Sequence, residues 1–262
     1  MIKLLMNKLI LHFDINGTIT PVDTTESGTE LEIANMIISK NVYGNVIDNK
    51  WILNENVYDQ THSITYYDHL KKNDKDNCKK ISFRFTNEGE PGENLNYLVD
   101  KVIDSMNKLL FNSFLNVIDE FPDALIVLRT FGPDTDKVIE KMKIVGKSNT
   151  FVKGLFSYEG DCCRLSLENG NIFTGMTNIN DLFKTSNDYL ALKENYHYWN
   201  DNKRNKVYGK QLVGDDDVLQ IFFDDNDCVN VINDTNVHNI TINTLCAMLD
   251  DNYYINKIYD AY

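Results

Sequence analysis

The chain has 262 residues, of which 42% are hydrophobic and 25% are charged, as in a folded domain that is large enough to carry an insertion. Aromatic residues make up 11%, which excludes a chain that is disordered over most of its length. The formal net charge is −13, and it argues against nucleic acid and anionic membranes as partners, since both attract clustered lysine and arginine. No apolar run has the roughly 18–20 residues that a membrane-spanning helix needs, and we expect a cytoplasmic protein.

The beginning of the chain and its cysteines both bear on this expected location. Residues 1–13 have a basic residue followed by apolar ones, as signal peptides do, but Lys8 interrupts the apolar stretch and Asp14 stands where a small-residue cleavage site is expected. We therefore interpret this segment as a buried strand. The five cysteines include no CxxC pair, Cys162 and Cys163 are adjacent, and the odd number favours free thiols in a reducing compartment.

Three short apolar runs are each followed by polar residues of a kind that carries chemistry. The runs are residues 9–13, 124–128 and 218–223. Asp14 follows the first run, Arg129 and Thr130 follow the second, and Asp224 follows the third. Continuous apolar runs of this length are typical of strands buried on both faces of a parallel sheet, and ligands of open α/β sheets bind at the carboxyl ends of the strands. The sequence therefore predicts an α/β fold with a doubly wound parallel sheet and one site built from distant segments.

Other segments have patterns of their own. Helices are predicted over residues 27–40, 94–111 and 135–145, from apolar residues at helical spacing. Ser27 and Asp134 are the candidate N-caps of the first and last helices, and Gly146 ends the last one. Strands are predicted over residues 42–54 and 80–85, a solvated loop over residues 71–80, and a hairpin over residues 156–173 with its turn at residues 168–170.

The long first gap between polar motifs predicts an inserted substructure. Roughly 110 residues separate Thr18 from Thr130, which is far beyond an ordinary connection or a single crossover helix. We therefore expect residues 1–20 and 121–262 to form a discontinuous core, and residues 21–120 to form a cap.

The polar motifs resemble those of the haloacid dehalogenase (HAD) superfamily. The segment from Asp14 to Thr18 reads Asp-Ile-Asn-Gly-Thr and resembles the first motif of that superfamily, Asp-x-Asp-Gly-Thr after a strand. Thr130 matches the second motif, Lys210 is the candidate for the third, and the acidic pair at residues 224–225 matches the fourth, all in the family's order. The combination of Asp-x-Asn, Arg-Thr-Phe-Gly and Phe-Phe-Asp-Asp-Asn is similar to a protist branch of the superfamily.

The resemblance implies a fold, a reaction and roles for these residues. It implies a HAD-like core with a cap, and a Mg²⁺-dependent phosphohydrolase or phosphotransferase that acts on a small phosphorylated molecule. Asp14 would be the nucleophile that forms an aspartyl-phosphate. Thr130 would donate a hydrogen bond to a phosphoryl oxygen, and Lys210 would bring a positive charge to the nucleophile and the phosphate.

The same resemblance implies a metal site. Two anions must approach each other in the reaction, so a hard divalent cation is needed. Asp14, the backbone carbonyl of Asn16 and a carboxylate of the pair Asp224 and Asp225 would hold Mg²⁺, which prefers oxygen ligands. The histidines have no spacing typical of a metal site.

Asn16 departs from the family pattern. The family has a second Asp there, which protonates the leaving group and later activates water. An amide cannot transfer a proton in this way, and general acid/base catalysis contributes roughly 10²–10⁴-fold. Two functions therefore remain open, a slow enzyme or a phosphate- and Mg²⁺-binding regulatory module that has lost turnover. Replacing Asn16 with Asp is expected to raise turnover on the order of 10²-fold.

Several of these residues also have structural interpretations. Asp14 could be a turn residue, Lys210 could be a solvated surface lysine with Lys206 as its rival, and Arg129 could bind an anion or form a structural ion pair. The aromatic residues at 189, 196, 198 and 199 could line a cleft or belong to the core. A response-regulator receiver also combines an acidic pair, a Thr and a Lys, but its acidic pair comes first in the chain, so the order here excludes it.

Overall fold

The computed structural model describes residues 8–21, 27–147, 149–160 and 162–261, and the chain forms two compact units. The core unit comprises the described residues of Met1–Pro21, Leu109–Ile242 and Asp251–Tyr262, and the insertion unit comprises those of Val22–Lys108 and Asn243–Asp250. The first residues of the expected N-terminal strand, 1–7, lie outside the described residues.

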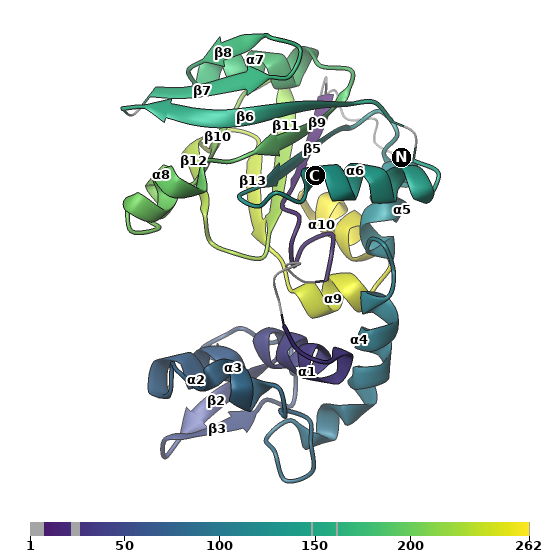
Figure 1. Cartoon of the computed structure of the whole chain (residues 1–262), viewed down its shortest axis with the longest axis vertical. Coiled ribbons are helices and arrows are strands. Elements are labelled where there is room, and N and C mark those ends of the chain that lie inside the picture. Colours follow the sequence, from purple (N-terminus) through teal and green to yellow (C-terminus); the bar gives the residue numbers. More distant parts are fainter. Residues whose placement is uncertain (1–7, 22–26, 148, 161, 262) are drawn as a thin grey trace. The chain divides into compact units, whose positions relative to one another are not determined.

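The core unit is built on one eight-stranded sheet. Its strands are β1 (Lys8–Phe13), β5 (Leu125–Thr130), β6 (Phe151–Glu159), β7 (Cys162–Leu167), β8 (Ile172–Thr174), β9 (Tyr189–Lys193), β11 (Val218–Asp224) and β13 (Val237–Thr241). Their order is β13-β11-β1-β5-β9-β6-β7-β8, and neighbours are parallel from β13 to β6. The three strands predicted from apolar runs are β1, β5 and β11, and they are neighbours within the parallel part of the sheet (Figure 1).

Helices cover both faces of this sheet. They include α5 (Asn112–Glu120), α7 (Met176–Thr185) and α10 (Tyr253–Ala261). On one face His12 of β1 contacts Phe183 of α7, with ring centroids 5.2 Å apart. On the other face Phe13 contacts Phe114 of α5 at 5.0 Å and Tyr254 of α10 at 5.2 Å. Because successive side chains of a strand point to opposite faces, burial on both faces explains why β1 is an almost continuous apolar run.

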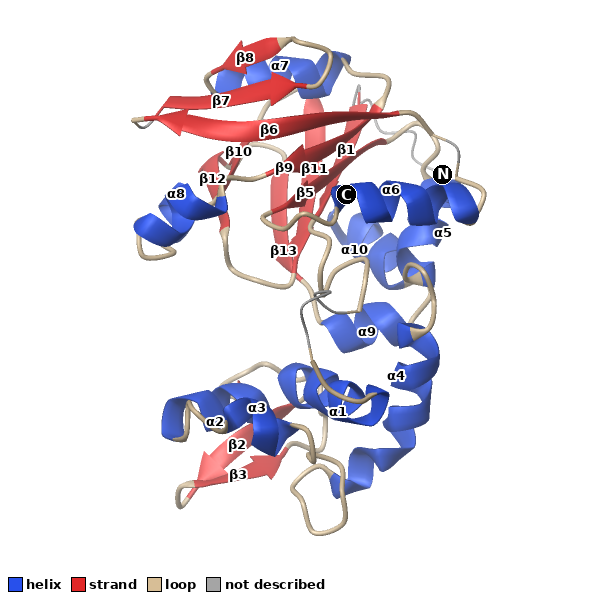
Figure 2. Ribbon diagram, in the orientation of Figure 1, coloured by secondary structure: helices blue, strands red, loops and turns tan. Residues whose placement is uncertain are grey.

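The core unit also contains smaller elements beside the large sheet, and α8, β10 and β12 are grouped on one side of it (Figure 2). They are α6 (Thr135–Ile144), α8 (Tyr196–Asp201), η2 (Lys206–Tyr208), β10 (Lys210–Val213) and β12 (Val229–Asn233). Strand β10 pairs in parallel with β12. Leu212 and Val229 form a small apolar cluster with Phe222 of β11, and this packing holds β10 against β11.

The insertion unit has its own core. Its elements are α1 (Glu30–Asn41), β2 (Tyr43–Ile47), β3 (Lys50–Leu53), β4 (Ile64–Thr65), α2 (Tyr66–Asn73), α3 (Cys78–Ser82), η1 (Glu93–Leu98), α4 (Val99–Met106) and α9 (Thr244–Leu249). An aromatic group of Trp51, Tyr66 and Phe85 packs inside it, with centroid separations of 4.8–5.8 Å.

No described helix combines the length and the apolar character that crossing a membrane requires.

The units divide the chain at other residues than the sequence predicts. Residues 109–120 belong to the core unit, because α5 packs on β1 and α10. Helix α9 belongs to the insertion unit, where the Asn243 side chain donates a hydrogen bond to the Asn41 carbonyl at 2.7 Å and the Ser105 hydroxyl donates one to Met248. These contacts join segments far apart in sequence, so spacing between motifs does not reveal them.

Two helix predictions are confirmed in place, α1 and α6, but their caps differ from expectation. The N-cap of α1 is Thr29 and not Ser27. Its hydroxyl accepts a hydrogen bond from the Glu32 N–H, and the Glu32 carboxylate accepts one from the Thr29 N–H, which is a capping box. Asp134 stands at the N-cap position of α6, but its side chain makes no capping hydrogen bond.

Residues 94–111 do not form the single helix that their apolar spacing predicts. The chain forms η1 and then α4, and α4 ends before α5 begins. The break is stabilised where the N–H of Phe111 donates a hydrogen bond to the carbonyl of Ile19 at 3.0 Å. Such a long-range bond competes with helical continuation and leaves no local sequence signal.

The predicted strand over residues 80–85 is wrong, because α3 ends at Ser82 and turns follow. Alternating apolar and polar residues imitate a strand there, while Phe85 packs against Tyr66. The predicted loop over residues 71–80 contains the end of α2 and the start of α3. Residues 42–54 form two strands, because Asp48 and Asn49 turn the chain with φ of 49° and 62°. The predicted hairpin with its turn at residues 168–170 is confirmed by β7 and β8, and β6 pairs with β7 as an additional antiparallel strand.

Candidate functional site

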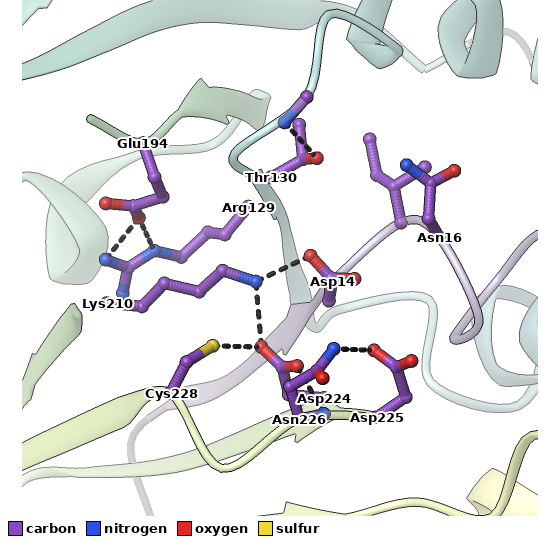
Figure 3. Close-up of polar contacts among 12 residues, drawn as sticks. Asp14, Asn16, Arg129, Thr130, Glu194, Lys210, Asp224, Asp225, Asn226 and Cys228 are labelled. Atoms are coloured by element: carbon purple, nitrogen blue, oxygen red, sulfur yellow. Dashed lines mark hydrogen bonds and ion pairs between the residues drawn. The ribbon is translucent and has the colours of Figure 1, made fainter. Parts of the chain in front are cut away.

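Three carboxylates meet at the carboxyl ends of β1 and β11. Asp14 follows β1, and its N–H donates a hydrogen bond to the Phe223 carbonyl at 2.9 Å, which extends the pairing of the two strands by one residue. Asp224 is the last residue of β11, and Asp225 follows it. One oxygen from each carboxylate lies within 4.8 Å of the others (Figure 3). The parallel register of β1 and β11 therefore brings residues 210 positions apart into one cluster.

Lys210 is the cation of this cluster. Its side chain is 1% exposed, and its ammonium group lies 2.5 Å from Asp14 Oδ1 and 2.7 Å from Asp224 Oδ2. The rival Lys206 is half exposed and pairs with Asp227. Packing of β10 beside β11 thus selects Lys210, a choice that the sequence leaves open.

Burial and mutual repulsion shape the electrostatics of the cluster. Burial raises the pKa of Asp14 to about 7, and Asp224 adds to this rise while Lys210 opposes it. Burial, followed by repulsion from Asp14 and Asp224, raises the pKa of Asp225 well above its usual range. Burial alone would lower the pKa of Lys210, but Asp14 and Asp224 outweigh it and the net pKa is raised. One ammonium group therefore faces three carboxylates, an excess of negative charge that a divalent cation would neutralise.

The loop after Asp14 depends on a glycine. Gly17 has φ of +75°, a backbone conformation that L-residues with a side chain rarely adopt. A Cβ atom at Gly17 would lie 2.6 Å from Asp225 Oδ2. The Gly17 N–H donates a hydrogen bond to the Thr20 carbonyl at 2.8 Å, and the Tyr254 hydroxyl of α10 donates one to the Thr18 carbonyl at 2.5 Å. The loop is thus fixed against both the acidic pair and α10.

Asn16 and Thr130 lie beside this loop. Lys210 and Asn16 are on opposite sides of Asp14 (Figure 3). The Asn16 amide donates a hydrogen bond to Asp134 Oδ2 at 3.0 Å, and its oxygen accepts one from the Thr20 hydroxyl at 3.3 Å. Thr130 is buried at the end of β5, where its hydroxyl accepts a hydrogen bond from the N–H of Gly132 at 3.0 Å. The Asp134 carboxylate, expected from the sequence to cap α6, thus accepts a hydrogen bond from Asn16.

Arg129 forms a structural ion pair, one of the two interpretations that its sequence context allows. Its guanidinium and the Glu194 carboxylate are both fully buried, with Nε 2.6 Å from Oε1. Its Nη1 donates a hydrogen bond at 2.8 Å to the carbonyl of Gln211, the residue after Lys210. The Glu194 N–H in turn donates one to the Thr130 carbonyl at 2.7 Å. The pair therefore ties the ends of β5 and β9 to the strand that carries Lys210.

The sequence did not identify three polar residues of the site. They are Glu194, which pairs with Arg129, and Cys228 and Asn226, which contact the acidic pair. Glu194 follows a short strand that was not singled out. The Cys228 thiol lies 3.3 Å from Asp224 Oδ2, and burial raises the pKa of this thiol, so it acts as a donor. Asn226 donates from its backbone to Asp224 at 2.9 Å and from its side chain to Asp225 at 2.7 Å. Asn226 directly follows the acidic pair, and that position was the available signal.

The four aromatic residues considered as one cleft do not gather in one place. Trp199 stacks on Phe131 at 4.7 Å, and Tyr196 contacts the same pair. Tyr198 stacks on Tyr158 at 4.0 Å. Tyr189 is buried and packs against Phe151. Only the group on Phe131 adjoins the site, since the ammonium group of Lys210 lies 5.3 Å from the centre of the Phe131 ring.

The donor set suits a hard divalent cation. Among the described residues, Asp14, Asp224 and Asp225 are the only group of three acidic, histidine or cysteine side chains whose ligand atoms converge in this way. All three offer carboxylate oxygens, which Mg²⁺ and Ca²⁺ prefer over softer metals. Asn226 orients the acidic pair from outside, as residues behind metal ligands commonly do.

Comparisons with known proteins give no relative from which a role could be carried over. No family model, no curated protein and no solved structure matches the chain. The argument for function therefore depends on the geometry of the site.

Proposed function

We propose that the protein is a Mg²⁺-dependent phosphohydrolase or phosphotransferase with a HAD-like core, which acts on a small phosphorylated molecule through an aspartyl-phosphate on Asp14. The observation that carries this proposal is the position of Asp14 at the end of the central strand, between the Lys210 ammonium and the acidic pair. A phosphoryl group brought to this position would meet a nucleophile, a fixed cation and a set of metal ligands together.

Each residue has a distinct part in the proposed reaction. Asp14, one or both carboxylates of the acidic pair, and the backbone carbonyl of Asn16 would hold Mg²⁺, which neutralises charge on the phosphoryl group when bound. The Asp14 carboxylate attacks phosphorus. Lys210 holds Asp14 Oδ1 at 2.5 Å and so limits the directions in which the nucleophile points. The Thr130 hydroxyl, fixed at the end of β5, donates to a phosphoryl oxygen.

The insertion unit supplies the proposed cap. It follows Asp14 in the chain, and the chain returns to the core unit at Leu109, where the nearby Phe111 N–H donates a hydrogen bond to the carbonyl of Ile19 in the segment after Asp14. Insertions at the carboxyl ends of strands are where α/β proteins vary substrate specificity. Within the core unit, the aromatic group on Phe131 would contribute to recognition of the small phosphorylated substrate.

Asn16 supports a second candidate function. Its amide cannot transfer a proton, and it is held on both sides by Asp134 and Thr20. A protein with the phosphate and Mg²⁺ cradle but without an acid/base group would bind these ligands and release product slowly. The alternative is therefore a regulatory module that binds Mg²⁺ and phosphate.

A metal titration with a panel of phosphate monoesters separates the two functions. The enzyme predicts turnover that requires Mg²⁺ and falls to background in Asp14→Asn, because the nucleophile is lost. Asp227→Asn is the matched control, since this exposed carboxylate lies near the acidic pair in sequence and binds Lys206 instead. Mg²⁺ and phosphate binding without turnover would establish the module, and binding of neither would contradict both functions.

A further inference from the structure

The proposed reaction needs a proton that Asn16 cannot supply. When the phosphorus–oxygen bond to an alcohol breaks, the leaving oxygen must gain a proton unless it is already a stable anion. The carboxylates of Asp14 and Asp224 are engaged with Lys210, and the Glu194 carboxylate is engaged with Arg129. Asp225 accepts a hydrogen bond from the Asn226 side chain and is one of the proposed metal ligands. The donor must therefore be sought on the other side of Asp14, where Asn16 lies (Figure 3).

Asp134 is a buried carboxyl group on that side. It is 3% exposed, and its Oδ2 lies 3.0 Å from the Asn16 amide nitrogen. Lys137 approaches its other oxygen at 3.6 Å, so Oδ1 and Oδ2 have different neighbours. Asp134 occupies the N-cap position of α6, yet its side chain makes no capping hydrogen bond. The Asp134 carboxylate is instead directed toward the Asn16 amide and the Lys137 ammonium group.

The same carboxylate lies near the Thr130 hydroxyl, the proposed donor to the phosphoryl group. Gly132 has no side chain, and the point where its Cβ would be lies 3.0 Å from Asp134 Oδ2, 3.4 Å from Thr130 Oγ1 and 3.6 Å from the Asn16 amide nitrogen. Three polar atoms thus lie within 3.6 Å of one point in the loop after β5. If the Thr130 hydroxyl binds a phosphoryl oxygen, Asp134 Oδ2 is within reach of a group attached to the same phosphorus.

We propose that Asp134 is the catalytic acid and base of this protein, in the place of the carboxyl group that Asn16 lacks; this inference rests on the proposed function. In the first step the bond from Asp14 to phosphorus forms, the bond from phosphorus to the alcohol oxygen breaks, and the Asp134 carboxyl gives its proton to that oxygen. In the second step a water oxygen bonds to phosphorus, the bond to Asp14 breaks, and the Asp134 carboxylate takes a proton from the water. Inorganic phosphate leaves, and both carboxyl groups regain their starting forms.

In this arrangement Asn16 is a positioning residue. Its amide donates to Asp134 and its oxygen accepts from Thr20, so it fixes the Asp134 carboxylate relative to the Asp14 loop. Asn16→Asp would place a second carboxyl group within hydrogen-bond distance of Asp134, and the two would share one proton. The gain expected from Asn16→Asp therefore shrinks to less than about 10-fold in the wild-type background, while the full gain, on the order of 10²-fold, appears when Asp134 is absent.

The test is the dependence of kcat/KM on the leaving group, measured with Mg²⁺ and phosphate monoesters that range from nitrophenyl to alkyl phosphates. Asp134→Asn should lower kcat/KM for alkyl phosphate by about 10²-fold or more, and for activated nitrophenyl phosphate by less than about 10-fold, because a stable leaving anion needs no proton. Asp136→Asn is the matched control. Asp136 lies two residues after Asp134, and its side chain is largely exposed and pairs with Lys153. This variant should leave both rates unchanged.

The double variant Asn16→Asp with Asp134→Asn should recover alkyl phosphate turnover, which a merely structural role of Asp134 would not allow. Should Asp134→Asn fail to fold, the wild-type protein still decides: a shallow dependence of rate on leaving-group pKa supports a proton donor, and a steep one overturns it. Equal loss on all leaving groups without recovery in the double variant also overturns the inference. Absence of any Mg²⁺-dependent turnover in the wild type overturns the proposed function instead, so the two failures are distinct.

Discussion

At the scale of single residues, the site brings opposite charges together where water is scarce. Lys210 is almost fully buried and contacts Asp14 and Asp224 at once. Removing a charged group from water is costly, and only close partners offset that cost. Burial, with repulsion between the carboxylates, raises the pKa values of Asp14 and Asp225, and the excess negative charge makes cation binding favourable.

Gly17 provides a residue-scale test of the metal site. Gly17→Ala should weaken Mg²⁺ binding, because the new Cβ would lie 2.6 Å from Asp225 Oδ2 and would displace that carboxylate. Gly146→Ala is the matched control: Gly146 has φ of +83° but nothing within 4 Å of its Cβ position. Both variants carry a backbone cost of roughly 1–2 kcal/mol, so both unfolding free energies should fall, and that of Gly17→Ala should fall further because of the contact with Asp225. Calorimetric Mg²⁺ titration should show weakened binding in Gly17→Ala alone, and equal affinities would count against the site.

At the scale of elements, periodicity in the sequence predicts what is locally determined. The apolar runs of β1, β5 and β11, the helices α1 and α6 and the antiparallel hairpin are all present. The errors occur where tertiary contacts decide the outcome. Phe85 belongs to an aromatic group and not to a strand, and the helix expected over residues 94–111 breaks where Phe111 bonds to Ile19.

The register of β7 gives a prediction at this scale. Cys162 is exposed and Cys163 is buried in the core, because adjacent strand residues point to opposite faces. Burial also raises the pKa of the Cys163 thiol, which leaves less of the reactive thiolate at pH 8. In the folded protein, iodoacetamide should therefore modify Cys162 quickly in the variant Cys163→Ser, and Cys163 slowly in the variant Cys162→Ser. Mass spectrometry of this peptide checks the rates, and the reverse order would mean that β7 is shifted by one residue.

At the scale of the whole molecule, parallel strand order assembles the site. The sequence motifs at Asp14, Thr130 and Asp224 meet because β11, β1 and β5 are neighbours whose carboxyl ends lie at one edge. This much could be predicted from runs and spacing. The contacts of Asn16 with Asp134 and of Arg129 with Glu194 span 118 and 65 residues, and no local sequence pattern predicts them. The sequence also does not predict that α9 belongs to the insertion unit, because its contacts there are with residues far away in the chain.

The central claim is that Asp14 accepts a phosphoryl group, and trapping that group tests it most directly. The protein is mixed with Mg²⁺ and an activated phosphate ester, quenched in acid and reduced with borohydride, which converts an aspartyl-phosphate to homoserine. Peptide mass spectrometry should find homoserine at position 14 in the wild type, and none in samples without Mg²⁺ or in Asp14→Asn. Conversion at another carboxylate, or none at position 14 while the protein turns the ester over, would contradict the account.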